Sequence, residues 1–318
     1  MNNQIKIFYT KDWPFDSAQD KTGYEMLDTG EGEKLERFGP YTFVRPHENA
    51  FWPKTLTKKE WENIDGKFWN GKSGAKAGWK MEREIPTKWE MEYRGIKFFA
   101  SPTPFRHLGF FPEQASHFDF IEEKIKIAKK KNEKPVKVLN LFSYTGVASL
   151  FALRAGAEVT HLDASKNILK WAKENEKLNN LDIGCPSGHP MSKLRIIEDD
   201  VIKFLEREEK RGNKYDAVIM DPPKFGRGPK GEVWEIEKDL PKLLVQVKKV
   251  LNNKPLFVIL TSYAIGTSSL SLGHALADTM KSFKGNVEQG ELCVLEKSNG
   301  KLIPLANTAL WISSSNIN

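Results

Sequence analysis

The sequence has 318 residues, of which 39% are hydrophobic and 29% are charged, a composition typical of a globular protein rather than a disordered or fibrous one. No apolar run approaches about 18 residues and the first residues lack a signal peptide's apolar stretch, so we expect a cytoplasmic protein without a membrane-spanning helix. The net charge of +7 permits an anionic partner such as a nucleic acid. The two cysteines, Cys185 and Cys293, match no metal-ligand spacing, so we expect free thiols and no metal site.

Residues 1–100 combine aromatic side chains with short β-rich segments. They contain six of the nine tryptophans, and residues 41–45, 89–93 and 96–100 have strand character. We therefore predict a small β-rich domain whose tryptophans form its core. The alternative is a nucleic-acid surface, because aromatic rings that can stack on bases alternate here with cations that can contact phosphates. That surface would contain Trp61, Lys67, Trp69, Lys72, Lys76, Trp79 and Lys80.

Residues 101–163 predict a connection, a helix and the first half of a mononucleotide-binding sheet. The segment 101–112 is punctuated by prolines, and residues 113–131 have the apolar spacing of a helix. Residues 136–141 and 158–162 are apolar runs of the length of buried strands, and between them residues 147–155 predict a helix. The second strand ends at Asp163, and a strand, tight turn, helix and strand with an acidic end is the order found in nucleotide-binding folds.

The turn after the first strand narrows the choice of ligand. Asp163 lies 23 positions after Asn140, close to the spacing at which a carboxylate accepts hydrogen bonds from a ribose. The turn contains Gly146 but also bulky Phe142 and Tyr144, whereas a dinucleotide pyrophosphate needs a glycine-rich backbone. This argues against NAD or FAD and favours S-adenosylmethionine, which has a ribose and an amino-acid tail but no phosphate. The alternative is an ordinary βαβ unit in which Asp163 only caps the next helix.

The rest of the chain continues the alternation of helices and strands. The stretch GRGPKGE at 226–232 and the Gly- and Pro-rich residues 182–193 predict loops, and Pro241 is expected to restart a helix. The other predicted helices are 165–180, 201–210 and 270–283, and the other predicted strands are 194–197, 215–220, 255–260, 291–296 and 308–313.

Acidic residues follow three successive strands, at Asp163, Asp200 and Asp221. Parallel strands bring their carboxyl ends to one edge, where open sheets bind ligands. We predict that Asp163 binds the ribose hydroxyls and that Asp200 accepts a hydrogen bond from the adenine amino group. The backbone N–H groups of residues 143–146 are expected to receive the cofactor's carboxylate. Helix capping is the alternative role for each acid.

The stretch Asp221-Pro222-Pro223 is the sharpest signal in the sequence. Two prolines restrict the backbone and make a rigid turn at the end of a strand. The Asp221 carboxylate and the Pro222 carbonyl can accept hydrogen bonds from an exocyclic amine, and Phe225 offers an aromatic face to a planar substrate. The alternative is a plain proline turn.

At these residues the sequence resembles class I S-adenosylmethionine-dependent methyltransferases, most closely the group that contains the bacterial large-subunit (23S) ribosomal RNA methyltransferases. The resemblance extends over residues 101–318 and rests on LNLFSYTG at 139–146, on Asp163, on Asp200-Val201 and on DPPKF at 221–225. The stretch FFPEQ at 110–114 is similar to a segment that the group places beside the cofactor. Residues 1–100 resemble the N-terminal part of a branch that lacks a recognisable RNA-binding PUA domain.

The resemblance implies a Rossmann-like α/β fold with a seven-stranded doubly wound sheet, mostly parallel with one antiparallel strand near the end. We predict that residues 1–100 form a β-rich domain that positions the substrate and that residues 101–318 form the S-adenosylmethionine-binding domain. The predicted catalytic residues are Asp221, Pro222 and Phe225. The predicted cofactor-binding residues are Gln114, Asn140, Phe142, Ser143, Tyr144, Thr145, Gly146, Asp163, Asp200 and Asp221.

The resemblance also bears on the methylated atom. Members of the group that make 5-methylcytosine are expected to carry a nucleophilic cysteine after the fifth strand, where this sequence has Thr261-Ser262-Tyr263. We therefore expect methylation of an RNA nucleobase with a nitrogen acceptor, although Lys224 stands where nitrogen methyltransferases usually have an aromatic residue. The alternatives are a non-catalytic RNA-binding protein that keeps the cofactor pocket, and a methyltransferase acting on a small molecule or a protein.

Overall fold

The computed structural model describes residues 4–10, 22–71, 77–131, 134–179, 194–263, 266 and 268–314. The chain divides into two compact units. Unit 1 consists of Met1–Phe8, Ser116–Leu292 and Leu305–Asn318, and unit 2 consists of Tyr9–Ala115 and Cys293–Pro304. Within the described ranges, no helix combines the length and the apolar character needed to cross a membrane.

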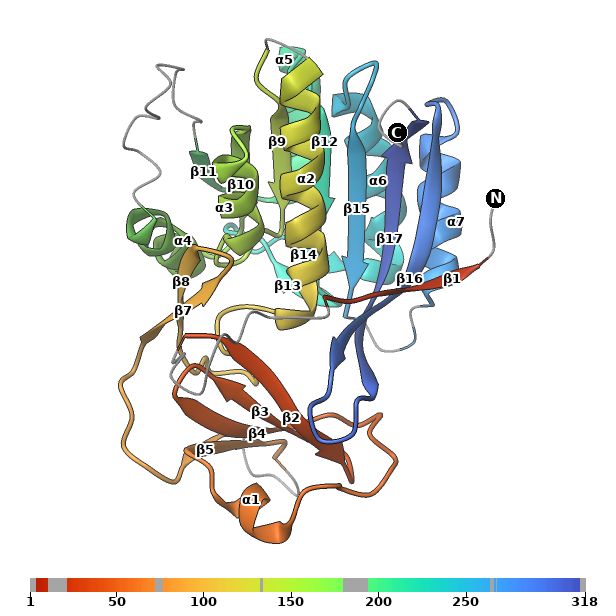
Figure 1. The fold of residues 1–318 in the computed structure, drawn as a ribbon. Helices are drawn as coiled ribbons and strands as arrows, with labels where there is room; N and C mark the ends of the chain where they lie inside the picture. Colours follow the sequence, from red (N-terminus) through yellow and green to blue (C-terminus); the bar gives the residue numbers. More distant parts are fainter. Residues whose placement is uncertain are drawn as a thin grey trace. The chain divides into compact units, whose positions relative to one another are not determined.

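Unit 1 is built on an eight-stranded sheet with the strand order β1-β16-β17-β15-β12-β9-β10-β11 (Figure 1). Strands β15, β12, β9, β10 and β11 pair in parallel, and β17 runs antiparallel to β15. The predicted α/β sheet, mostly parallel with an antiparallel strand near its end, is therefore confirmed. The strands are β1 (Ile5–Phe8), β9 (Lys137–Leu141), β10 (Glu158–Asp163), β11 (Leu194–Glu198), β12 (Ala217–Met220), β15 (Phe257–Ser262), β16 (Gly285–Leu295) and β17 (Leu302–Ser313).

Helices cover both faces of this sheet. Successive side chains of a strand point to opposite faces of the sheet. On one face Leu139 packs in a buried cluster with residues of α5, α6 and α7, and on the other face Val138 packs in a cluster with residues of α2 and α3. Burial of both faces explains why the strands read as continuous apolar runs. The helices are α2 (Ala115–Lys131), α3 (Val147–Arg154), α4 (Lys166–Leu178), α5 (Val201–Arg211), α6 (Ile236–Val250) and α7 (Ser269–Met280).

Three elements of unit 1 differ from the expectations. The loop predicted at 226–232 is confined to residues 228–232, where it connects the two strands of a hairpin, β13 (Phe225–Arg227) and β14 (Val233–Glu235). Helix α6 begins before Pro241 and runs through it, because buried apolar residues on either side hold the helix to the core. Strand β1 adds an unexpected eighth strand, parallel to β16. The predicted loop 182–193 lies outside the described residues.

Unit 2 contains a five-stranded sheet of order β2-β3-β4-β5-β6 and a two-stranded sheet of β7 and β8. Trp61 and Trp89 are buried, which confirms the core interpretation for these two, whereas Trp69 is 43% exposed. Trp13, Lys72 and Lys76 lie outside the described residues. The elements are β2 (Tyr24–Gly30), β3 (Glu33–Phe38), β4 (Tyr41–Pro46), α1 (Lys58–Glu62), β5 (Gly66–Trp69), β6 (Gly78–Met81), β7 (Trp89–Tyr93), β8 (Ile96–Ala100) and the 3-10 helix η1 (Pro112–Gln114).

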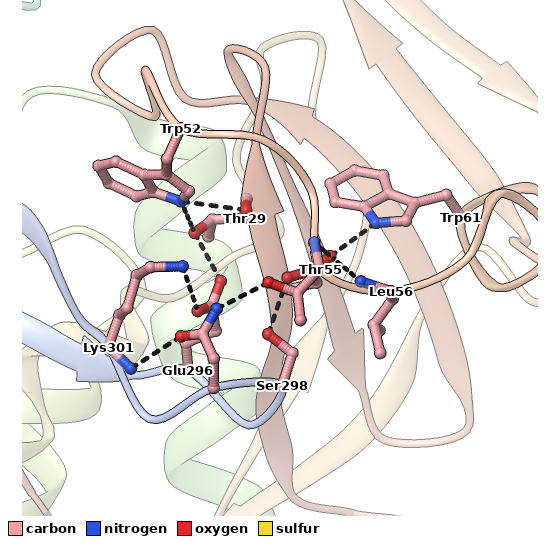
Figure 2. A network of polar contacts seen from close by, with 10 residues as sticks. Thr29, Trp52, Thr55, Leu56, Trp61, Glu296, Ser298 and Lys301 are labelled. Carbon is pink, nitrogen blue, oxygen red and sulfur yellow. Dashed lines mark hydrogen bonds and ion pairs between the residues drawn. The ribbon is translucent and has the colours of Figure 1, made fainter.

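The tip of the β16–β17 hairpin, residues 293–304, belongs to unit 2 and is bonded into it (Figure 2). Glu296 forms a parallel β-bridge with Met26, and its carboxylate accepts a hydrogen bond of 2.6 Å from the Thr29 hydroxyl. The Ser298 hydroxyl donates to Asp28 Oδ1 at 2.8 Å. The compact units therefore differ from the division between residues 100 and 101 predicted from the sequence. Strand β1 belongs to unit 1 although it precedes residue 100, and the hairpin tip belongs to unit 2 although it follows residue 101.

Candidate active site

Strands β9, β10 and β12 end level with one another at the carboxyl edge of the sheet, because Leu141 pairs with both Leu162 and Met220. The residues that follow these strands are therefore held at one edge by the register. Backbone hydrogen bonds continue past the strands, from Asp221 N–H to the Leu141 carbonyl at 3.4 Å and from Asp199 N–H to the Asp163 carbonyl at 3.2 Å. The structure thus brings to this edge the three acids predicted from the sequence, Asp163, Asp200 and Asp221.

The turn between β9 and α3, which we call the 142–146 loop, has an unusual backbone. Phe142, Tyr144 and Gly146 have φ angles of 54°, 51° and 88°, all in the left-handed region. For residues with a Cβ this conformation is costly, and it persists only where the surroundings over-determine it. Such conformations cluster at functional sites.

Hydrogen bonds within the protein hold this backbone. Ser143 donates its N–H and its hydroxyl to the Leu162 carbonyl at 3.1 and 2.9 Å. Tyr144 N–H donates to Asp163 Oδ2 at 3.0 Å, and Gly146 N–H donates to the Ser143 carbonyl at 3.1 Å. Three of the four amides expected to receive a carboxylate are therefore already bonded inside the protein.

A buried polar chain lies behind the loop. Asn140 donates from its side-chain amide to Ser149 Oγ at 2.9 Å, and Ser149 Oγ lies 3.0 Å from His161 Nδ1. Burial lowers the pKa of His161 to about 3, so the ring is neutral near pH 7. A methyl group on Gly146 would make a tight contact of 3.1 Å with His161 Cε1, at a φ of 88° that residues with a Cβ rarely adopt. The Asn140 side chain, predicted to bind the cofactor, thus has a partner in α3.

A second buried amide supports the loop from α4, where Asn175 donates to the Thr145 carbonyl at 2.9 Å. Together with Ser149 and His161, Asn175 was not identified from the sequence. A single polar residue on the buried side of a strand or helix matches no motif, so the sequence carried no signal for these three.

The first two acids accept backbone hydrogen bonds beside the helices that follow them, but only Asp200 is an N-cap, since the N-cap of α4 is Ser165. Asp163 Oδ1 accepts from Ser165 N–H at 2.9 Å, immediately before α4, and Asp200 Oδ1 accepts from Lys203 N–H at 2.9 Å as the N-cap of α5. Burial raises the pKa of Asp163 above its usual value, although the amides of Ser165 and Tyr144 partly offset this. Capping and ligand binding are compatible, because each carboxylate has about four lone-pair sites.

The Asp-Pro-Pro turn is tied to the 142–146 loop by a residue that was not predicted. Trp234 of β14 is buried, donates from Nε1 to the Pro223 carbonyl at 2.7 Å, and has its ring centroid 4.9 Å from that of Phe142. Pro222 is buried and Asp221 half-buried, whereas Phe225 is 63% exposed. An isolated tryptophan in a polar Gly- and Pro-rich stretch is the sequence signal that would have identified Trp234.

The remaining predicted residues lie elsewhere. Gln114 ends η1 in unit 2 and is half-buried. Cys293 is a free, buried cysteine in β16, and Cys185 lies outside the described residues. Among the residues that the structure describes, no group of three or more His, Cys, Asp or Glu side chains is arranged to hold a metal ion.

Comparison with known proteins identifies relatives of this architecture. The sequence profile of a family described as S-adenosylmethionine-dependent methyltransferase matches residues 113–277. The crystal structure of a SAM-dependent methyltransferase from Agrobacterium tumefaciens is similar at a TM-score of 0.85 and 37% identity, over 96% of this chain and 93% of that one. A putative SAM-dependent methyltransferase from Streptococcus mutans shares the fold at a TM-score of 0.68 and 16% identity, over 93% of this chain and 76% of that one.

Curated relatives match over a shorter span. Ribosomal RNA large subunit methyltransferase I from Enterobacter sp. (strain 638) is 33% identical over 141 residues, which are 44% of this chain and 32% of the relative. Ribosomal RNA large subunit methyltransferase K/L from Pseudoalteromonas translucida (strain TAC 125) is 31% identical over 193 residues, 60% of this chain and 24% of the relative. The matches thus span a third or less of the length of these relatives.

Proposed function

The chain belongs to the S-adenosylmethionine-dependent methyltransferase family, and we propose that it methylates a nucleobase of RNA, with a nitrogen atom as the favoured acceptor. The names of the curated relatives, both ribosomal RNA large subunit methyltransferases, support an RNA substrate. Such a substrate agrees with the cytoplasmic location expected from the sequence. Residues 1–100 are proposed to help position it.

The residues at the carboxyl edge of the sheet fit the family's cofactor. The amides of the 142–146 loop are mostly bonded within the protein, so the loop lacks the row of free N–H groups that a pyrophosphate needs. Asp163 and Asp200 retain acceptor capacity after accepting these backbone hydrogen bonds, as a ligand rich in hydroxyl and amino groups requires. When bound, S-adenosylmethionine supplies a methyl group activated by a sulfonium. The proposed binding residues are those predicted from the sequence, with the Asn140 side chain better suited to supporting the loop.

The observation that carries the proposal is the Asp-Pro-Pro turn beside this loop. Trp234 fixes the turn through the Pro223 carbonyl. The Pro222 carbonyl and the Asp221 carboxylate of this fixed turn are the proposed acceptors for an exocyclic amine. Phe225 follows in β13 with most of its ring exposed, as a surface for a flat base requires. Holding a nucleophile in line with its target contributes about 7–11 kcal/mol toward a barrier without acid–base machinery.

The chemistry of the acceptor favours nitrogen. An amine or ring nitrogen has a lone pair and needs orientation, desolvation and loss of a proton. Cytosine C5 has no lone pair until a nucleophile adds to the ring. Strand β15 ends in Thr261 and Ser262, both buried, at the place where a covalent mechanism would need a cysteine.

The proposal is tested by comparing Asp221→Ala with the double variant Cys185→Ser, Cys293→Ser for methyl incorporation into RNA. We expect the Asp221 variant to lose methyl transfer, and its affinity for S-adenosylmethionine to fall by a smaller factor than its activity. The cysteine variant should stay active. Loss of activity in a folded cysteine variant would contradict nitrogen methylation. Binding of the cofactor without transfer to any RNA would support the non-catalytic alternative.

A further inference from the structure

The β13–β14 hairpin has two unlike faces. Its inner face is formed by Trp234 and by Gly226, which pairs with it and where a methyl group would lie 3.3 Å from Pro223 Cγ. Its outer face carries Phe225 and Val233, each 63% exposed, exposed Arg227, and half-buried Glu235, which pairs with Phe225. The inner face fixes the hairpin to the Asp-Pro-Pro turn, so the outer face needs another explanation for its exposed apolar and charged side chains.

The charge of the hairpin is unbalanced. Lys224, Arg227 and Lys230 are exposed, and within the described chain no carboxylate forms an ion pair with any of them. Glu232, the acid in the turn, instead pairs with Lys203 of α5 at 2.5 Å and accepts from Lys230 N–H at 2.9 Å. This pairing anchors the turn to α5, and the other carboxylate of the hairpin, Glu235, pairs with Lys238 of α6. The hairpin therefore keeps three exposed cations without an ion pair in the described chain, and one of them, Lys224, lies with its Nζ 5.6 Å from the centroid of the Phe225 ring.

We propose that the outer face of the β13–β14 hairpin binds the sugar–phosphate backbone of a single-stranded RNA segment on either side of the methylated base. Cations that track a backbone around an aromatic stacking surface are the features by which proteins hold single-stranded nucleic acid. An unpaired strand is required because an enzyme that modifies a base must reach it outside the helical stack. The inference rests on the proposed RNA substrate and adds to it the form of the RNA and the residues that hold it.

Fluorescence anisotropy with a short, labelled single-stranded RNA of mixed sequence tests the inference. The test variant is Arg227→Ala, Lys230→Ala, and the matched control is Lys210→Ala, Lys254→Ala, which removes the same charge from exposed lysines at the end of α5 and before β15. Each lost contact to a single strand reduces the slope of log affinity against log salt by about 0.7. For the hairpin variant, which loses two contacts, the slope of log affinity against log salt should therefore fall by about 1.4, and the affinity at ~0.1 M salt should be about 25-fold weaker.

The control should stay within about twofold of the wild type at the same salt, because its two lysines lie outside the hairpin. The two variants carry the same net charge, so a difference between them does not come from net charge. Equal losses in both variants, or an unchanged hairpin variant, would overturn the inference while leaving an RNA substrate in place. A duplex of the same sequence bound as tightly as the single strand would also overturn it. If the wild type binds no RNA and transfers methyl groups only to a protein or a small molecule, both the inference and the proposed substrate fail. Calorimetry with S-adenosylmethionine checks that each variant is folded.

Discussion

Asp163 holds two pieces of backbone and lies where the ribose of the cofactor is expected. Its carboxylate accepts from Tyr144 N–H in the 142–146 loop and from Ser165 N–H before α4. The N-cap of α4 is Ser165, so Asp163 is not the helix cap of the alternative interpretation. Its role in holding this backbone and a role in binding a ligand are not exclusive. What distinguishes them is whether the remaining lone pairs bind a ligand.

We predict that Asp163→Ala weakens S-adenosylmethionine binding by about 1.5–3 kcal/mol, because charge-assisted hydrogen bonds to the ribose are lost. The matched control is Asp216→Ala, whose carboxylate accepts from Lys137 N–H and the Asn252 amide, both at 2.8 Å, before the first residue of β12. Isothermal titration should show weaker binding only in the Asp163 variant, whereas both variants lower the melting temperature. Unchanged affinity in the Asp163 variant would mean that this carboxylate only holds the backbone of the loop and of the segment before α4.

Gly146 offers a test of the loop itself. Gly146→Ala places a methyl group against His161 in a left-handed conformation, whereas Gly212→Ala has a similar φ of 69° with no atom within 4 Å of the new methyl group. Both variants should lose about 1–2 kcal/mol for the left-handed backbone. We expect Gly146→Ala to lose more than this in urea unfolding and to bind the cofactor more weakly. Equal losses of stability and normal binding would show that the contact with His161 is not restrictive.

At the scale of elements, the tip of the β16–β17 hairpin depends on Asp28. Asp28 Oδ2 accepts from Thr55 N–H at 3.0 Å, and from Leu56 N–H and Trp61 Nε1 at 2.8 Å each, and Oδ1 accepts from the Ser298 hydroxyl. Burial alone would raise the pKa of Asp28, but these hydrogen bonds outweigh it and the pKa lies below its usual value. The side chain thus joins β2, the segment before α1 and the hairpin tip. Figure 2 labels its partners Thr55, Leu56, Trp61 and Ser298.

We predict that Asp28→Ala destabilises the protein by about 3 kcal/mol, because it leaves three N–H donors, including that of buried Trp61, without their acceptor. Ser298→Ala removes one hydrogen bond and should cost about 1 kcal/mol. Tryptophan fluorescence follows this unfolding in urea, since most tryptophans lie in residues 1–100. Similar losses in the two variants would show that Asp28 is not the centre of the network.

The sequence predicted elements where periodicity was strong and missed those that depend on distant partners. The parallel strands of unit 1 were predicted because a short, continuous run of apolar residues is by itself typical of a buried strand. Strand β1 is a short run whose partner, β16, lies at the other end of the chain. The strands of the β13–β14 hairpin were not predicted, because the sequence there is rich in Gly and Pro. The packing of Trp234 on Phe142 stabilises the hairpin instead. Neither contact is visible in the local sequence.

At the scale of the molecule, the order of strands and turns indicated the carboxyl edge of the sheet as the site, and the register places Asp163, Asp200 and Asp221 there. The residues that support the loop, such as His161 and Asn175, could not be predicted because they act through packing across the fold. The division of the chain into its two compact units could not be predicted from the sequence either. Residues 293–304 join unit 2 through hydrogen bonds between segments more than two hundred residues apart, such as the 270-residue separation between Asp28 and Ser298.

The most direct test of the account is mass spectrometry of RNA nucleosides after incubation of the protein with RNA and S-adenosylmethionine carrying a deuterated methyl group. The account predicts one deuterium-labelled nucleoside, with the label on a nitrogen of the base, formed by the wild type and not by Asp221→Ala. The absence of any labelled nucleoside, or a label confined to protein or small molecules, would contradict an RNA substrate. A label on a ring carbon would contradict the nitrogen acceptor.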